Sequence, residues 1–290
     1  MSALNHGAAS TAAAFPVWRW LELARVRQWI HLLPLPVAGY DFGQPLLTNL
    51  PPVARGVGIT FCVLAFGYLL NAVADRDMDL DHQKNPLVRA DTVGQAFLFP
   101  LALLVGLALA QAAVTSWWVV MCTAVSLVSG CLYSVGPRLK AVPFLGTFMN
   151  LTSFLPLLFV GMPDPAMSPR MVALAVSFGA MLLQNQLIHE VADAAEDRGG
   201  GVQTTYLRLG PIGTALLAAA CGLVVLLISA WAVARLAQPA WTTLHALPYV
   251  VLFPALVATQ GDSPTRMRAA RKMQRWFAVA SGALLFFGLR

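Results

Sequence analysis

The chain has 290 residues, of which 58% are hydrophobic and only 11% are charged. Together with a mean hydropathy of +0.68, these values exclude an ordinary soluble domain, which at this length needs far more polar surface. The net charge is +6 without a Lys/Arg-rich tail, so we expect membrane lipids and an anionic substrate as partners, and no nucleic acid. The expected fold class is an all-α integral membrane protein.

Apolar segments long enough to cross a bilayer recur along the chain, separated by short polar or Pro- and Gly-containing joints. We expect residues 1–16 to form a flexible tail and residues 17–290 to form a single transmembrane domain. Nine spans are predicted, at residues 20–42, 54–74, 93–114, 116–135, 143–162, 170–191, 209–233, 241–259 and 273–289.

The positions of the basic residues support this number of spans, because Lys and Arg beside a span are retained on the cytoplasmic side. Fifteen of the 19 basic residues fall at the N-terminal flank and at every second joint between spans, and four fall on the opposite side. We therefore expect a cytoplasmic N-terminus in a bacterial inner membrane. The basic run Arg266, Arg268, Arg271 and Lys272 is expected to contact anionic lipid.

Two acidic segments, residues 71–79 and 189–197, align without a gap and fall at expected cytoplasmic ends of spans. A spacing of four residues places the matched side chains of each segment along one stripe of a helix. With their neighbours the segments hold eight of the 13 acidic residues, so we expect them to face each other across one cytoplasmic mouth. The matched residues are Asn71, Asp75 and Asp79 in the first segment, and His189, Asp193 and Asp197 in the second.

Carboxylates gathered in this way need a counter-charge. At about 5 Å and an effective dielectric constant of about 20, two of them repel by roughly 3 kcal/mol, so protonation or a divalent metal must relieve them. Asp and Asn oxygens suit Mg²⁺, which bridges protein carboxylates to substrate phosphates. The pattern therefore predicts a Mg²⁺–diphosphate site with basic residues near it. The candidates are Arg25, Lys84, Arg89, Arg138, Lys140 and Arg198.

The two segments resemble the signatures of the UbiA-type intramembrane prenyltransferase superfamily, N-D-x-x-D-x-x-x-D and D-x-x-x-D. Asn71, Asp75 and Asp79 fit the first signature. Asp193 and Asp197 fit the second. The likeness covers essentially the whole chain, including the expected number of spans.

Three further patches carry the same resemblance. Residues 133–140, YSVGPRLK, look like the Y-S-x-x-P-x-x-L-K stretch that follows the family's fourth span, shortened here by one residue. Gly201, Thr204 and Thr205 resemble a G-x-x-T segment that follows the second signature. Arg25 matches an arginine that members use on the diphosphate.

By this resemblance the fold is a ring of nine helices around a central cavity, with a cytoplasmic cap of loops and short helices that carry the signatures. The implied reaction is the ionisation of an isoprenyl diphosphate with two Mg²⁺ ions, followed by transfer to an acceptor, which in most members is aromatic. The implied metal ligands are Asn71, Asp75, Asp79, Asp193 and Asp197. The implied substrate-binding residues are Arg25, Asn71, Lys84, Arg89, Tyr133, Ser134, Lys140 and Arg198.

Three positions depart from the family pattern. Ala72 replaces the acid at the second position of the first signature, and Asn85 stands where the family's Arg-Pro-Leu begins. His189 stands where an Asp or Asn is common. His189 could act as a neutral hydrogen-bonding group, as the base for the acceptor's proton, or as a structural residue.

Two other functions stay open. Some relatives ionise the same diphosphate and fold the cation back onto its own double bonds, so a terpene cyclase without an acceptor is the alternative enzyme, favoured by the departures at Ala72 and Asn85. A transporter would also carry acids near the membrane. The odd number of spans and the position of the signatures at the membrane surface argue against a transporter.

Overall fold

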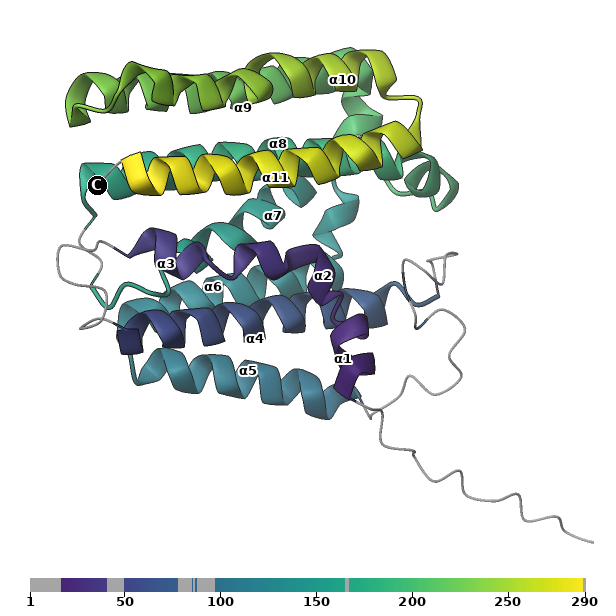
Figure 1. Ribbon diagram of the computed structural model, residues 1–290. Helices are drawn as coiled ribbons and strands as arrows, with labels where there is room; N and C mark the ends of the chain where they lie inside the picture. Colours follow the sequence, from purple (N-terminus) through teal and green to yellow (C-terminus); the bar gives the residue numbers. More distant parts are fainter. Residues whose placement is uncertain are drawn as a thin grey trace, which may run out of the picture.

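The computed structural model describes residues 17–40, 50–77, 85, 87, 97–164 and 167–288. All regular secondary structure in this part is helical, and the long helices run side by side along one direction (Figure 1). The helices are α1 (Val17–Leu23), α2 (Val26–Trp29), α3 (Leu35–Gly39), α4 (Leu50–Ala74), α5 (Leu98–Ala113), α6 (Trp117–Ser134), α7 (Leu145–Phe154), α8 (Pro169–Gly199), α9 (Thr205–Leu236), α10 (Phe253–Gln260) and α11 (Pro264–Gly288). Short 3₁₀ turns lie at Ile30–Leu32, Leu139–Ala141, Leu155–Leu158 and Ala240–Ala246, and Pro248–Leu252 is a turn of π-helix.

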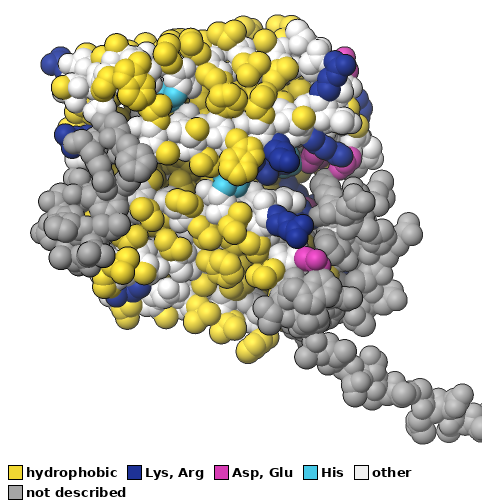
Figure 2. Space-filling view, viewed as in Figure 1, with side chains coloured by type: hydrophobic (Ala, Val, Ile, Leu, Met, Phe, Trp, Pro, Cys, Tyr) yellow, Lys and Arg dark blue, Asp and Glu magenta, His cyan; other side chains and the backbone are white. Residues whose placement is uncertain are grey.

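Five segments of the described chain are long and apolar enough to cross a membrane, namely α4, α6, α8, α9 and the stretch Ala240–Gln260. They match five of the nine expected spans. Apolar side chains cover much of the face shown in Figure 2, and α9 exposes Leu216, Leu223 and Leu227 along its length. Soluble proteins do not expose apolar surface of this extent, so the chain is an integral membrane protein.

The described parts of the other four expected spans are helical too, but three are interrupted or short and the fourth, α11, is strongly basic in its first half. The first is broken at Arg25, whose φ of 51° is left-handed, and again by the 3₁₀ turn that follows α2. α7 passes into a 3₁₀ turn at Leu155, α5 has 16 residues, and α11 begins with a basic half. The closed ring of nine spans therefore stays a prediction.

Two helices extend well beyond the expected ends of their spans. α8 continues to Gly199, eight residues beyond the expected end at 191, and α11 begins at Pro264, nine residues before the expected start at 273. A span predicted from hydropathy ends at the first charged residues. The helix itself continues, because Ala, Glu and Arg are good helix formers. The charged residues of these two segments therefore stand on continuous helices.

α3 is held against α4 by a close approach of backbones. Gly56 lies at the contact, where a Cβ would be 2.9 Å from Gly161 Cα and 2.9 Å from Pro36 Cβ. A real Cβ does not tolerate such distances, so only glycine allows the segments to touch here. This contact fixes the position of α3, and with it the broken first segment.

Gly56→Ala is expected to destabilise the protein, although Ala is normally favoured over Gly inside a helix by about 1 kcal/mol. The added methyl group must displace α3 or Gly161, and overpacking of this kind costs about 1–3 kcal/mol. Gly67→Ala in the same helix is the matched control, because a Cβ there meets nothing within 4 Å. Thermal unfolding in detergent compares the two; a melting temperature of Gly56→Ala at or above the wild-type value would contradict the packing argument.

Candidate active site

The first acidic cluster joins the end of α4 to the turn that follows α6. α4 ends at Ala74, and Asp75 lies in the turn directly after it, with its N–H still bonded to the Asn71 carbonyl (2.9 Å). Lys140 Nζ lies 2.5 Å from both carboxylate oxygens of Asp75, and Arg138 Nη2 lies 2.9 Å from Oδ1. The regular helix of this segment therefore ends before Asp75, and Asp79, the third residue of the expected stripe, lies outside the described residues.

Asn71 belongs to the same cluster. Its Oδ1 accepts hydrogen bonds from Lys140 Nζ (3.1 Å) and from Ser134 Oγ (3.2 Å). Left-handed backbone at Gly136 (φ 65°) and Arg138 (φ 47°) turns the chain back after α6. This turn brings both cations onto the end of α4.

The chain's own cations supply the counter-charge that Asp75 needs. Asp75 is only 8% exposed, and a buried carboxylate is tolerated only when cations and donors compensate the loss of water. Loss of one partner of such a pair costs about 3–5 kcal/mol. Lys140 and Arg138 are therefore structural partners of Asp75. The sequence predicts that Lys140 also binds the substrate.

Of the magnesium ligands that the sequence predicts, this cluster contains the side-chain oxygens of Asp75 and Asn71, which are of the type that Mg²⁺ prefers and which already accept hydrogen bonds from Lys140. Among the described residues no three His, Cys, Asp or Glu side chains surround one point. An ion held here by Asp75 and Asn71 would take its other ligands from water, the diphosphate and the rest of the chain, as Mg²⁺ usually does. Asp79, Lys84 and Arg89 lie outside the described residues.

The second acidic segment lies on the last turns of α8, where the expected helical stripe continues unbroken. His189 Nδ1 lies 3.4 Å from Asp193 Oδ2, one turn further along, and the Asp193 side chain is 17% exposed. Asp197 is half-buried and Arg198 is exposed. Arg198 lies near Tyr206 at the start of α9, and no contact among the described residues joins it to the first cluster.

Glu190 on α8 is buried and ties three helices together. It accepts hydrogen bonds from Thr147 Oγ1 on α7 (2.7 Å) and from Tyr206 N on α9 (3.1 Å). The hydroxyl oxygens of Thr147 and Thr205 are 2.8 Å apart. This network fixes the loop that follows the second acidic segment, and it gives Thr205 of the G-x-x-T resemblance a structural place.

Tyr133 and Gln186 connect the two clusters. Tyr133, near the end of α6, lies close to both Asp75 and Glu190. Gln186 of α8 lies within hydrogen-bonding reach of Tyr133 and Glu190. Arg271 of α11 also lies close to Tyr133. The ends of α4, α6, α8 and α11 thus meet in one region.

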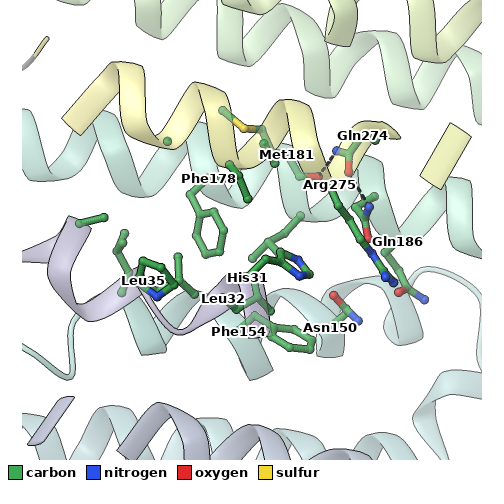
Figure 3. A pocket seen from close by; sticks show the side chains of 18 of the residues that line it. His31, Leu32, Leu35, Asn150, Phe154, Phe178, Met181, Gln186, Gln274 and Arg275 are labelled. Atoms are coloured by element: carbon green, nitrogen blue, oxygen red, sulfur yellow. Dashed lines mark hydrogen bonds between the residues drawn. The ribbon is translucent and has the colours of Figure 1, made fainter. Parts of the chain in front are cut away.

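A cavity of about 360 Å³ lies between the first segment, α7, α8 and α11 (Figure 3). Its lining changes from polar to apolar along both long helices, from Arg271 to Ala283 on α11 and from Gln186 to Leu174 on α8. At 1.5 Å per residue each stretch is roughly 18 Å long. The cavity therefore suits an amphiphile with a charged head at the mouth and a hydrocarbon chain inside.

None of the site residues named from the sequence is among the described side chains that line this cavity. Arg25 lies at the break between α1 and α2, outside the lining. The assignment of Arg271 to lipid contact was wrong, because Arg271 lines the cavity together with Gln274 and Arg275. Their spacing of three and four residues, which puts them on one face of a helix, was the available signal.

The Arg271 guanidinium is largely withdrawn from water. Burial, and then the neighbouring charge of Arg275, lower the pKa of Arg271 to about 10, while Tyr68, Asp193 and Tyr133 act in the opposite direction. Arg271 remains a cation at neutral pH, and it stands close to the second acidic cluster.

Asn85 connects two of the departures from the family signature. It is fully buried, its Nδ2 donates to the Ala72 carbonyl (2.8 Å), and its Oδ1 accepts from Leu87 N (3.1 Å). Positions 72 and 85 are therefore in direct contact. The family pattern has an acid at position 72 and an arginine at position 85. Both are absent here, so the net charge of this part of the site is the same as in the family pattern.

The helical bundle and its amphiphilic cavity are those of an intramembrane prenyltransferase. Residues 32–279 match the UbiA prenyltransferase family, and the chain belongs to this family.

Individual relatives agree with this membership. Digeranylgeranylglyceryl phosphate synthase of Methanoregula boonei is 28% identical over 226 residues, which span 73% of this chain and 77% of the relative. A solved UbiA homologue from Archaeoglobus fulgidus bound to GPP and Mg²⁺ has a TM-score of 0.69 at 18% identity, over 93% of this chain and 99% of that one. A structure described as digeranylgeranylglyceryl phosphate synthase in membranes has a TM-score of 0.73 at 14% identity, over 94% and 98%. At these identities the structural likeness shows the fold alone.

Thr147→Val is expected to lower the free energy of unfolding by about 1–3 kcal/mol, because the isosteric change leaves the buried Glu190 carboxyl group without one of its donors. Thr152→Val on the same helix is the matched control, since its hydroxyl donates to the Met149 carbonyl of its own helix (3.1 Å). Denaturation in detergent measures both variants. Equal stability of the two would show that the Glu190 network does not hold the mouth together.

Proposed function

We propose that the chain ionises an isoprenyl diphosphate with the help of Mg²⁺ and transfers the prenyl group to an acceptor. The observation that carries this proposal is the cavity whose lining changes from polar to apolar, with Arg271 at its polar end close to Asp193 and Tyr133. The hydrocarbon chain would lie among the apolar side chains, which keep water away from the allyl cation. The UbiA homologue solved with GPP or DMAPP and Mg²⁺ supports this choice of donor.

In this reaction the bond between C1 of the prenyl chain and the diphosphate oxygen breaks, and both electrons leave with the diphosphate. The acceptor then forms a bond to C1 and loses a proton. His189 lies 3.4 Å from Asp193, which would stabilise an imidazolium, so the contact favours the role of base over that of a neutral group.

Two Mg²⁺ ions, when bound, would stabilise the charge that develops on the leaving diphosphate. Lys140 has a flexible stem and can turn from Asp75 toward the substrate, with Asn71 and Ser134 in the same hydrogen-bonded group. The proposed metal ligands are Asn71, Asp75, Asp79, Asp193 and Asp197. The proposed substrate ligands are Arg25, Asn71, Lys84, Arg89, Tyr133, Ser134, Lys140 and Arg198.

We further propose that residues 17–290 form one domain of nine spans arranged as a ring, after a tail at residues 1–16. α1 and the end of α11 lie at opposite ends of the bundle (Figure 1), as an odd number of crossings requires. The distribution of Lys and Arg supports a cytoplasmic N-terminus and a cytoplasmic site in a bacterial inner membrane.

A terpene cyclase is the second candidate, and the departures at Ala72 and Asn85 are the argument for it. The contact between these residues weakens the argument. The acid and the arginine of the family pattern are both absent at these neighbouring positions, so the net charge there is the same as in the pattern and the departures require no change in the reaction.

Asp75→Asn and Asp193→Asn are each expected to lower kcat by at least about 100-fold, because these carboxylates act chiefly in the transition state. The protein should still insert, since the apolar spans are unchanged and the amide introduced by Asp75→Asn keeps an oxygen that accepts from Lys140, although loss of the buried ion pair is expected to lower its stability. Asp77→Asn is the matched control and should stay within about twofold of wild type, because its side chain is 80% exposed beside Arg76. Near-normal diphosphate release by both active-site variants would defeat the assignment.

Purified protein incubated with Mg²⁺ and geranyl, farnesyl or geranylgeranyl diphosphate separates transfer from cyclisation. We expect prenylated product only when an acceptor is added, with release of one diphosphate per transfer. Mass spectrometry of the extracted products provides the measurement. A cyclic hydrocarbon or alcohol formed without any acceptor would establish the cyclase instead.

A further inference from the structure

α11 presents two arginines to the cavity in a fixed orientation. Arg271 and Arg275 lie one turn apart and both line the cavity. Gln274, between them in sequence, is 1% exposed and pins α11 to α8, because its Nε2 donates to the Met181 carbonyl (3.1 Å) and its Oε1 accepts from Asn185 Nδ2 (2.5 Å) (Figure 3). These contacts therefore hold α11 in the rotation that directs Arg271 and Arg275 toward the cavity.

Neither of these two cations forms an ion pair in the part of the chain that the structure describes, although Asp193 lies within electrostatic range of Arg271. No Asp or Glu is among the described residues that line the cavity, and neither arginine forms an ion pair with a described side chain. The Nε of Arg271 is fully buried and has no hydrogen-bond partner there. Like charges one turn apart repel each other, and a buried donor without an acceptor is unfavourable.

The wall that carries these arginines differs from the one that carries the first acidic cluster. α11 packs on α8, α10 and α3, whereas Asp75 is held between α4 and the turn after α6. His31 of the first segment lies near both Arg271 and Arg275 and lines the same cavity (Figure 3). A group bound between the two arginines would therefore be held by α11 and the first segment, whereas a diphosphate bound at Lys140 would be held by the turn after α6.

We propose that Arg271 and Arg275 bind an anionic group of the acceptor, a carboxylate or a phosphate monoester, and so select acceptors that carry one. This inference rests on the proposed transferase function. The planar guanidinium matches both oxyanions through paired hydrogen bonds. An anion placed between the two arginines removes their mutual repulsion and gives the buried Nε of Arg271 an acceptor. A terpene cyclase has no acceptor, so Arg271 and Arg275 would have no anionic group to bind.

The test uses two pairs of acceptor probes that differ in charge, with geranylgeranyl diphosphate and Mg²⁺ as donor system. The first pair is 4-hydroxybenzoate and 4-hydroxybenzamide, and the second is a 1-O-alkylglycerol 3-phosphate and the corresponding alkylglycerol. The readout is the ratio of kcat/KM for the anionic member to that for the neutral member. We expect wild type to prefer the anionic member of one pair, and the preferred pair identifies the anion as carboxylate or phosphate.

Arg275→Gln is expected to lower this ratio by about tenfold or more through the KM of the anionic acceptor, and Arg275→Lys to restore part of it. Arg271→Gln should act in the same way. Arg268→Gln is the matched control on α11, because Arg268 is exposed and pairs with Glu196 (2.8 Å), so its ratio should stay at the wild-type value.

Two results would overturn the proposal. One is an unchanged ratio in Arg275→Gln, with both members of the pair slowed equally, since that would assign Arg275 to the donor or to stability. The other is diphosphate release by wild type without preference for either anionic acceptor. Failure of the proposed function is distinguishable, because wild type would then release no diphosphate from the donor under any condition.

Discussion

The ion pair between Asp75 and Lys140 is the contact on which the arrangement of the mouth depends. In a chain that is 58% hydrophobic, apolar helices in lipid gain little from burying apolar surface against each other, so polar contacts carry much of the specificity of their packing. The Lys140 ammonium also binds Asn71, and thereby holds the end of α4 to the turn after α6. Glu190 does the same for α7, α8 and α9. Both acidic segments thus act as structural joints as well as candidate ligands.

Hydropathy and spacing were sufficient to predict the class of protein, five of its spans and the position of both acidic segments at span ends. They were not sufficient to pair charges. Several basic residues lie near the mouth in sequence, and only the left-handed turn at Gly136 and Arg138 decides that Lys140 meets Asp75. Sequence spacing cannot show which cation reaches which acid, because that choice is made by backbone geometry between helices far apart in the chain.

The residues that the sequence analysis missed share one cause. A hydropathy window treats the first charged residues as the end of a span, so α11 was expected to start at 273 and Arg271 was placed at the lipid surface. The helix begins at Pro264, and its polar cavity lining at Arg271, Gln274 and Arg275 continues directly into Ala278 and Gly282. The periodicity of three and four residues was present in the sequence. This periodicity crosses residue 273, where the span was expected to start from its composition alone.

The proposed transfer between two anionic substrates would bring two negative charges close together, as the crowded carboxylates do. At about 5 Å and an effective dielectric constant of about 20, two anions repel by roughly 3 kcal/mol, so each needs its own cations. Lys140 and Arg138 stand on the wall formed by α4 and α6, and Arg271 and Arg275 stand on α11. In the proposed reaction, cations on different elements would hold the charged groups of donor and acceptor apart while both approach at C1. The cavity lining, which changes from polar at Arg271 to apolar at Ala283, would then orient the hydrocarbon chain away from the charged groups.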